Sequence, residues 1–285
     1  MTWEQQRVSF GSNAANYDSR RPDWPAETAR WLTGTEPGTE AGPEPGSDRA
    51  GTGLEVLDLG AGTGKLTETL AGLGHSVTAV DPDPGMLAVL ARKLPQVRVI
   101  EAGAEQIPLP DGSVDVVTVA QAWHWLKQPD AALEIARVLR PGGRLAVAWH
   151  NRDLQVPWVA ELNALAGVPG WANGLNARAA EPGPTGPTGP TGQTGPTGRG
   201  DQAQVDLSIA EFGPVEHATF AYTLRMPTAA LVDLVSSWSY VATRPDRDEV
   251  LEQVEQLAER VAAEEGNSGE LGLPHRTECY RASRI

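Results

Sequence analysis

The amino-acid sequence predicts an α/β protein built on a doubly wound, mostly parallel β-sheet. Two observations support this fold class. Strand-like and helix-like segments alternate from residue 54 to about residue 150, as expected where crossover helices join parallel strands. Within this region an apolar strand runs through a glycine-rich turn into a helix, over Val56–Leu66. Sheets of this type bind ligands at such turns, outside the carboxyl ends of their strands.

Before the sheet, residues 1–33 are expected to form an N-terminal arm that ends in a helix over Ala26–Leu32. Residues 34–53 are rich in Gly, Pro and Glu and show no apolar period. Such a segment cannot bury enough surface to offset the entropy lost on ordering. We therefore interpret it as a flexible linker.

The alternating region defines five strands and three helices. The expected strands cover residues 54–58, 75–80, 97–100, 114–120 and 144–149, and the expected helices cover residues 65–73, 84–94 and 130–139. Apolar side chains recur at helical spacing in the helices, as at Leu66, Leu70 and Leu73. Asp130 is predicted to cap the third helix, and the Arg-Pro-Gly-Gly segment at 140–143 to stop it and turn the chain into the fifth strand.

The remainder of the chain is less regular. A helix is expected around 158–165, and residues 173–204, with their Gly-Pro-Thr repeat, are expected to form a disordered insertion. A collagen triple helix needs three chains and a longer tract than this repeat. A strand at 215–226, a helix from Thr228, a helix that begins with a capping box at 246–249 and a last strand at 277–283 complete the prediction.

Composition limits the possible partners. The 285 residues carry a formal net charge of −14, which argues against a nucleic-acid backbone as the main partner. The lone cysteine, Cys279, cannot form an internal disulfide, and the start of the chain lacks the pattern of a signal peptide. With no apolar run of membrane-spanning length, we expect a cytoplasmic protein, monomeric or homodimeric, that does not bind membranes.

Three nucleotide-type ligands compete for the glycine turn. A phosphate loop of the Walker type would need glycine at 59 and Ser or Thr at 66, where the chain has Leu59 and Leu66. The dinucleotide fingerprint would place its third glycine one residue later than Gly64. The pattern Asp58-x-Gly60-x-Gly62-x-Gly64 instead resembles motif I of the class I S-adenosylmethionine (SAM)-dependent methyltransferases. A turn that merely closes a strand onto a helix is the alternative interpretation.

Asp81 follows Gly60 by 21 residues, at the end of the second expected strand. A carboxylate about 20 residues after such a turn accepts hydrogen bonds from ribose hydroxyls. Both NAD and SAM contain ribose, so Asp81 does not separate them. It also opens the turn at 81–84, a role that is compatible with ribose binding.

Two later segments strengthen the resemblance. Residues 103–117 look like the segment that follows strand three in this superfamily, and residues 140–145 match its later signature. The resemblance implies that Ala104 and Glu105 border the adenine of the cofactor. The resemblance covers residues 54–149 well. It implies a seven-stranded sheet whose seventh strand runs antiparallel between strands five and six. It also implies a methyltransferase domain over 54–285, with helical lid insertions within 151–260.

The resemblance also implies the cofactor, SAM, and the residues around it. SAM has no phosphates, so its site needs no basic cradle, and its methyl group is already electrophilic, so the protein chiefly aligns the reacting atoms. The expected cofactor-binding residues are Asp58, Gly60, Ala61, Gly62, Gly64, Asp81, Pro82, Met86, Ala104, Glu105, Ala120 and Trp123.

His124 and His150 are the candidate catalytic bases, because each follows a strand whose carboxyl end faces the expected site. A histidine among tryptophans is as often a packed core residue. The two histidines make a poor metal pair, since no third ligand has matching spacing, and we expect no metal.

The Ala-Trp-His-Trp segment at 122–125, the arm and the segment at 236–241 together resemble a subgroup that includes trans-aconitate methyltransferases. This implies a small-molecule acceptor, methylated at a carboxylate or hydroxyl oxygen. The expected substrate-binding residues are Tyr17, Arg20, Ser237 and Tyr240, with Arg225 and Arg244 as further candidates. Two alternatives stay open: a SAM-binding protein without enzymatic activity and, disfavoured by the glycine spacing, an NAD-dependent oxidoreductase.

Overall fold

The computed structural model describes residues 22–37, 53–168, 210–242, 244–266 and 269–285. The expectations for the arm before residue 22, for residues 38–52 and for the 173–204 insertion lie outside these ranges. The chain divides into two compact units. The first comprises residues 1–150, 207–222 and 276–285, and the second comprises residues 151–206 and 223–275. The domain boundaries expected from the sequence stay a prediction.

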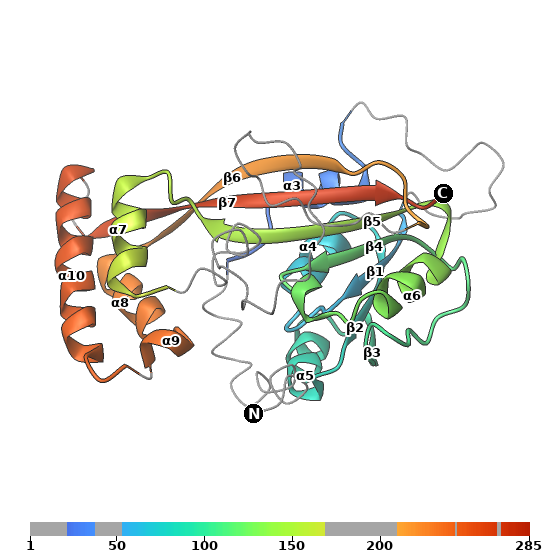
Figure 1. The fold of residues 1–285 in the computed structure, drawn as a ribbon, viewed down its shortest axis with the longest axis horizontal. Helices are drawn as coiled ribbons and strands as arrows, with labels where there is room; N and C mark the ends of the chain where they lie inside the picture. The colour runs from blue at the N-terminus through green and yellow to red at the C-terminus, as the bar shows by residue number, and fades with distance from the viewer. Residues whose placement is uncertain (1–21, 38–52, 169–209, 243, 267–268) are drawn as a thin grey trace, which may run out of the picture. The chain divides into compact units, whose positions relative to one another are not determined.

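Seven strands form one sheet in the order β3-β2-β1-β4-β5-β7-β6 (Figure 1). Strands β1 to β5 pair in parallel, which confirms the predicted fold class. The strands are β1 (Glu55–Leu59), β2 (Ser76–Asp81), β3 (Arg98–Glu101), β4 (Val114–Ala120), β5 (Leu139–Arg152), β6 (Glu216–Pro227) and β7 (Glu270–Ser283).

The last strand, β7, runs antiparallel to β5. Near the start of β5, Gly143 accepts a backbone hydrogen bond from Arg284, just after the end of β7. Just after the end of β5, Asp153 donates to Pro274, near the start of β7. Since the start of one strand pairs with the end of the other, the two strands run in opposite directions. The position of β7 between β5 and β6 is the one that the resemblance implied.

In the first unit, the core lies where two helices cover one face of the sheet. The helices of this unit are α3 (Ala26–Thr33), α4 (Lys65–Gly72), α5 (Pro84–Lys93) and α6 (Asp130–Val138), with a 3-10 turn, η2 (Trp123–Trp125). Leu32 of α3 and Leu66 and Leu70 of α4 pack with Val56 and Val116 of the strands. The apolar stripe that predicts α4 is thus the face that it buries.

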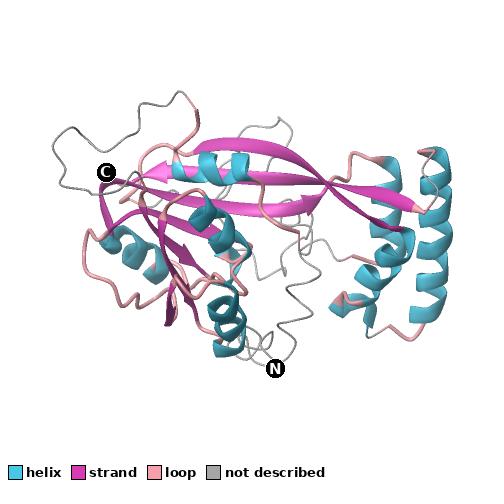
Figure 2. Ribbon diagram, turned by 180° about the vertical axis from the view of Figure 1, so that it is seen from behind, coloured by secondary structure: helices cyan, strands magenta, loops and turns pink. Residues whose placement is uncertain are grey.

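The second unit has its own apolar core. Its helices are α7 (Pro157–Leu165), α8 (Thr228–Ser236), α9 (Ser239–Ala242) and α10 (Arg247–Glu264). Leu162 of α7, Leu231 of α8 and Leu257 of α10 are fully buried and belong to one cluster. Figure 2, in which helices are cyan, shows α10 alongside α7 and α8. The alternation of apolar and charged residues along α10 is explained by this one-sided packing.

The segment at 140–143 was predicted to form a turn between a helix and a strand, and this prediction was wrong. It lies inside β5, which begins at Leu139 rather than at Arg144, and a register shift against β4 accommodates it. Gly142 has a φ of +74°. A Cβ on Gly143 would lie 2.8 Å from the carbonyl oxygen of Arg140. The two glycines therefore form a bulge, which lets the strand continue through a sequence that reads as a stop.

Three further expectations about element ends were wrong. β7 begins seven residues before Thr277, at Glu270. Pro129, not Asp130, precedes the first residue of α6, and no side chain caps it. The capping box at 246–249 does not form, because the carboxylate of Asp246 accepts two hydrogen bonds from Arg244 and makes no cap. A guanidinium fork outcompetes the backbone N–H groups for that carboxylate.

Within the described ranges, no helix has both the length and the apolar composition needed to cross a bilayer. The same residues hold no group of three or more His, Cys, Asp or Glu side chains placed to bind a metal ion.

Candidate functional site

The glycine turn connects β1 to α4 and is closed by backbone hydrogen bonds to the neighbouring strand. The N–H groups of Gly60 and Ala61 donate to the carbonyl of Val80 in β2, at 2.8 and 3.1 Å. Gly60, Gly62 and Gly64 have φ values of +73°, +56° and +83°, which L-residues with a Cβ rarely adopt. The repeated glycines thus have a conformational cause.

The three glycines differ in what lies above them. A Cβ on Gly60 would lie 2.5 Å from the Cβ of Ala122, and one on Gly64 would lie 2.7 Å from Leu90. A Cβ on Gly62 would meet no atom within 4 Å. Gly60 and Gly64 therefore allow close packing, whereas Gly62 presents bare backbone to open space that a ligand can enter.

Asp81, at the end of β2, is fastened to this turn. Its Oδ2 accepts the N–H of Gly62 at 2.9 Å, and its Oδ1 accepts the N–H of Asp83 at 2.8 Å. Asp83 in turn caps α5 through the N–H groups of Gly85 and Met86. Each carboxylate oxygen can accept more than one hydrogen bond, so this arrangement is compatible with additional bonds from ribose hydroxyls.

Asp58 has a different environment. It is 1% exposed, and its carboxylate accepts hydrogen bonds from Thr67 of α4 at 2.6 Å and Thr118 of β4 at 3.0 Å. Burial raises the pKa of Asp58 to about 6, against the lowering effect of these two hydrogen bonds. The Asp58 side chain thus connects β1, the strand before the glycine turn, to α4 and to the neighbouring strand β4.

The loops after β2, β3 and β4 are joined to one another. Ala102, just after β3, donates its N–H to the carbonyl of Asp81 at 3.2 Å. Glu105 accepts the N–H of Lys127, from the segment after β4, at 3.2 Å. Between them lies Ala104, which is buried. The structure therefore gathers the expected adenine-side residues at the carboxyl edge of the sheet, next to Asp81.

The segment after β4 contains a residue that the sequence analysis missed. Gln121, which follows Ala120, has a φ of +59°, the one positive value found at a non-glycine residue of the described ranges. Its side-chain amide donates to the carbonyl oxygen of His150 at 3.1 Å. Backbone strain of this kind is frequent at functional sites. No local signal in the sequence identifies Gln121.

The two candidate bases differ in their surroundings. His124 lies on η2 and is exposed, with its ring 5.0 Å from that of Trp125, whereas Trp123 beside it is buried. His150, near the end of β5, is half-buried. Its Nδ1 lies 2.6 Å from the hydroxyl of Thr277 on β7.

Two aromatic rings flank His150, and neither was expected at the site. Trp24 stacks on the imidazole at 3.8 Å between ring centroids, and Tyr222 of β6 lies at 6.1 Å. Trp24 is itself held by Thr69 of α4, whose hydroxyl donates to its carbonyl oxygen. Trp24 was assigned only to the arm, and β7 and β6 supply the other two contacts from more than 70 residues away.

The expected substrate residues are only partly described. Tyr17 and Arg20 lie outside the described residues, as does the side chain of Tyr240. Ser237 belongs to the second unit, is exposed, and donates its hydroxyl to the carbonyl of Leu234. The guanidinium of Arg244 is engaged by both carboxylate oxygens of Asp246.

The residues at the turn fit the expected cofactor. Open space over Gly62 and the carboxylate of Asp81 suit a ribose-bearing ligand of positive charge. Lys65, the nearest cation along the chain, is paired with Asp23 at 2.7 Å. Pro82 and Met86 continue from Asp81 into α5, where Met86 is buried. A pyrophosphate would instead call for basic partners.

Comparisons with known proteins agree with this geometry. The family model described as "Methyltransferase domain" matches residues 57–147. An uncharacterized methyltransferase of Mycobacterium tuberculosis is 39% identical over 279 residues, which cover 97% of this chain and 96% of that protein. A demethylmenaquinone methyltransferase of Renibacterium salmoninarum is 41% identical over 97 residues, which cover 34% of this chain and 41% of that protein.

Among solved structures, a protein of Anaeromyxobacter dehalogenans provisionally assigned as a type II methyltransferase matches with a TM-score of 0.57 and 25% identity. The match covers 93% of this chain and 97% of that one. Both units therefore have counterparts in one solved chain.

Proposed function

The chain belongs to the class I SAM-dependent methyltransferases, and from that premise we propose that it transfers a methyl group to a hydroxyl oxygen of a small, flat molecule. The proposal rests on one observation, the cluster of Trp24, His150 and Thr277. Because the family supplies the reaction and the cofactor, the acceptor and the roles of individual residues are what we add.

The surroundings of His150 support a hydroxyl acceptor. A hydroxyl must lose its proton as its oxygen takes the methyl group, and an imidazole is suited to accept that proton near neutral pH. If Nδ1 carries hydrogen and donates to Thr277 at 2.6 Å, the second nitrogen, Nε2, is the one that accepts. Thr277 then fixes the tautomer, as the partner of a catalytic histidine commonly does.

A carboxylate acceptor has less support. It would need no base but would need cations, and Arg244, one of the residues expected to provide them, is held by Asp246 at 2.8 and 2.7 Å. The other described candidate, Arg225, is exposed on β6. The imidazole of His150 is therefore the better-supported partner for the accepting group.

Contacts within the first unit connect His150 to the cofactor turn. Ala122 packs against Gly60, and its neighbour Gln121 donates to the carbonyl of His150. From the other side, Trp24 links the imidazole to α4, the helix that follows the turn. SAM, when bound over Gly62 and Asp81, supplies an electrophilic methyl group. The protein orients the acceptor against Trp24 and removes its proton through His150.

The stacking surface supports the acceptor's shape. The rings of Trp24 and Tyr222 lie 3.8 and 6.1 Å from that of His150, and such surfaces favour planar, partly apolar molecules. The relative named demethylmenaquinone methyltransferase supports the small-molecule class of acceptor.

The test is methyl transfer from SAM labelled in its methyl group. The full-length protein is incubated with matched panels of phenols and hydroquinones, aliphatic carboxylic acids and amines, and products are identified by mass spectrometry. We expect O-methylated phenols or hydroquinones. Transfer only to carboxylates, nitrogen or carbon would overturn the proposed acceptor, and failure to bind SAM would overturn the proposed cofactor residues.

A further inference from the structure

The loop between β3 and β4, residues 102–113, has no regular secondary structure but carries Ala104 and Glu105. Proline occupies two of its positions, Pro108 and Pro110, and a prolyl nitrogen cannot donate a hydrogen bond. The loop therefore cannot hold its shape through a regular backbone ladder. Its conformation depends on groups supplied by other elements.

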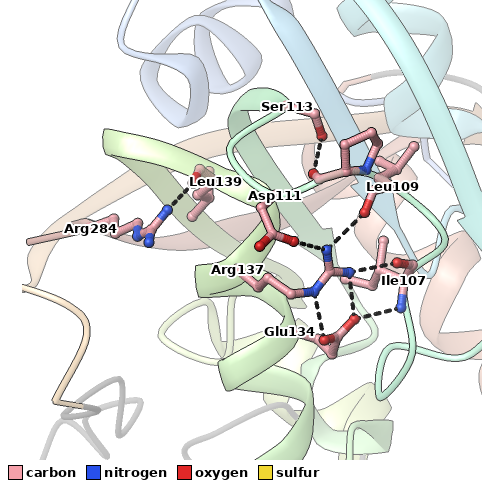
Figure 3. A network of polar contacts seen from close by, with 9 residues as sticks. Ile107, Leu109, Asp111, Ser113, Glu134, Arg137, Leu139 and Arg284 are labelled. Carbon is pink, nitrogen blue, oxygen red and sulfur yellow. Dashed lines mark hydrogen bonds and ion pairs between the residues drawn. The ribbon is translucent and has the colours of Figure 1, made fainter.

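One side chain of α6, Arg137, supplies most of them. Its guanidinium donates to the carbonyl oxygen of Ile107 at 2.8 Å and to that of Leu109 at 2.8 Å. It also donates to the carboxylate of Asp111 at 2.7 Å. Figure 3 shows the guanidinium lying among these three loop residues, with each contact drawn as a dashed line. A single guanidinium group thus holds three residues of the loop segment 107–111.

Glu134, one turn earlier on α6, completes the attachment. Its Oε2 accepts the N–H of Ile107 at 2.9 Å. Both of its oxygens accept from Arg137, each at 2.8 Å. This bidentate pair fixes the guanidinium plane before the loop is engaged. The Arg137 hydrogen bond also holds the pKa of Glu134 below its usual value, so the carboxylate stays charged.

The network holds the chain directly after Ala104 and Glu105, the expected adenine-side residues. Ile107 is 2% exposed and stands three residues after Ala104 and two after Glu105. At the other end of the loop, Gly112 and Ser113 donate their N–H groups to the carbonyls of Arg137 and Val138. Only the stretch from 103 to 106 lies between this attachment and the bond of Ala102 to Asp81. The conformational freedom of residues 103–106 is therefore restricted from both ends.

We propose that Arg137, oriented by Glu134, is a positioning residue for the adenine of the cofactor. By fastening the backbone of Ile107 and Leu109 to α6, it fixes the place of Ala104 and Glu105 before the cofactor binds. Such preorganisation raises affinity because the loop loses less freedom on binding. The inference rests on the proposed function and on the adenine contacts expected of Ala104 and Glu105.

The variant R137M removes the fork but keeps a side chain of similar length. The matched control is R140M, since Arg140 makes a comparable ion pair with Asp115 at 2.6 Å, and both guanidinium side chains are about one-third exposed. The ion pair of Arg140 is with Asp115 of β4, outside the loop segment at 103–109. Calorimetric titration then compares S-adenosylhomocysteine with S-ribosylhomocysteine, which lacks the adenine.

We expect R137M to bind S-adenosylhomocysteine about tenfold more weakly, the loss that about 1.4 kcal/mol produces. Its affinity for S-ribosylhomocysteine should equal that of the wild type. R140M should bind both ligands as the wild type does. Hydrogen exchange of the backbone amides at 103–109 should accelerate in R137M alone.

Equal losses for both ligands, or unchanged binding of S-adenosylhomocysteine, would overturn the positioning role. If R137M does not fold, R137K replaces it: the ammonium keeps the charge but cannot form the fork. It should then show the same adenine-dependent loss, and wild-type selectivity in R137K would overturn the inference. If the wild type itself does not bind S-adenosylhomocysteine, the proposed cofactor residues are wrong, which separates the two failures.

Discussion

The carboxylate of Asp81 accepts the backbone N–H of Gly62 at 2.9 Å. The acid that ends β2 and the middle glycine of the turn after β1 are thus one hydrogen-bonded element, although they are 19 residues apart in the sequence. The charge that favours a cationic, ribose-bearing ligand is held next to the glycine that leaves room for it. Shape and charge at the turn therefore depend on one another.

Removal of the Asp81 carboxylate should impair binding more than stability. D81A removes a charged acceptor, and hydrogen bonds to charged groups contribute about 1.5–3 kcal/mol. We expect affinity for S-adenosylhomocysteine to fall by more than about tenfold, as measured by calorimetry. D83N is the control, because asparagine can still cap α5, and it should stay within about threefold of the wild type. Equal effects of D81A and D83N would contradict the role of Asp81.

Gly62 and Gly142 form a matched pair of sites. Both have positive φ, and a Cβ at either would meet no atom within 4 Å. Alanine should therefore cost each variant a similar amount of stability, about 1 kcal/mol, from backbone strain alone. Only G62A should weaken binding of S-adenosylhomocysteine, because only its methyl group enters the ligand's space. Chemical denaturation and calorimetry measure the two effects, and normal binding by G62A would show that the cofactor lies elsewhere.

The buried carboxyl group of Asp58 should make the free energy of unfolding depend on pH. Its pKa is about 6 in the folded protein against 3.8 for the unfolded reference, so the folded state holds the proton more tightly. Its contribution to the free energy of unfolding is fully present below the lower value and is lost as pH rises through the higher one. Relative to wild type, D58N should gain up to about 2.5 kcal/mol between pH 4 and pH 7.5.

The measurement is denaturant unfolding of both proteins across that pH range without cofactor. T69V removes a hydroxyl that donates to the backbone carbonyl of Trp24, and it provides a control without a titrating group. A difference between D58N and wild type that does not change with pH would mean that the carboxyl titrates alike in both states.

His150 and His124 are distinguished by substitution with glutamine. H150Q should reduce kcat by about 100-fold or more, within the usual contribution of a general base, with affinity for S-adenosylhomocysteine unchanged. H124Q should reduce kcat by less than about threefold, because His124 is exposed on η2. The kinetics require the acceptor found in the panel above, and a larger effect at His124 would reverse the assignment. T277V tests the tautomer and should lower kcat while leaving KM unaltered.

Much of the fold could be predicted because the signals are local. The apolar period of α4 and the strand at Val114–Ala120 agree with the structure at or within one residue of their ends. Element ends were predicted wrongly where the pattern of residue types does not show which partner a group binds. Asp246 was expected to cap α10, but its carboxylate accepts hydrogen bonds from Arg244, two residues earlier. The segment at 140–143 was expected to end a helix, but a bulge that includes Gly143 keeps it within β5.

By itself, the sequence determined the glycine turn, the acid at Asp81 and the class of ligand that suits them, because backbone conformation and residue spacing are local properties. Only the tertiary structure decided which residues meet around His150, the proposed base. It brings Trp24 and Thr277 to His150 and joins Arg137 to the loop that carries Ala104 and Glu105. These contacts join residues from 30 to more than 120 positions apart, and chain separation of that length leaves no periodic trace in the sequence.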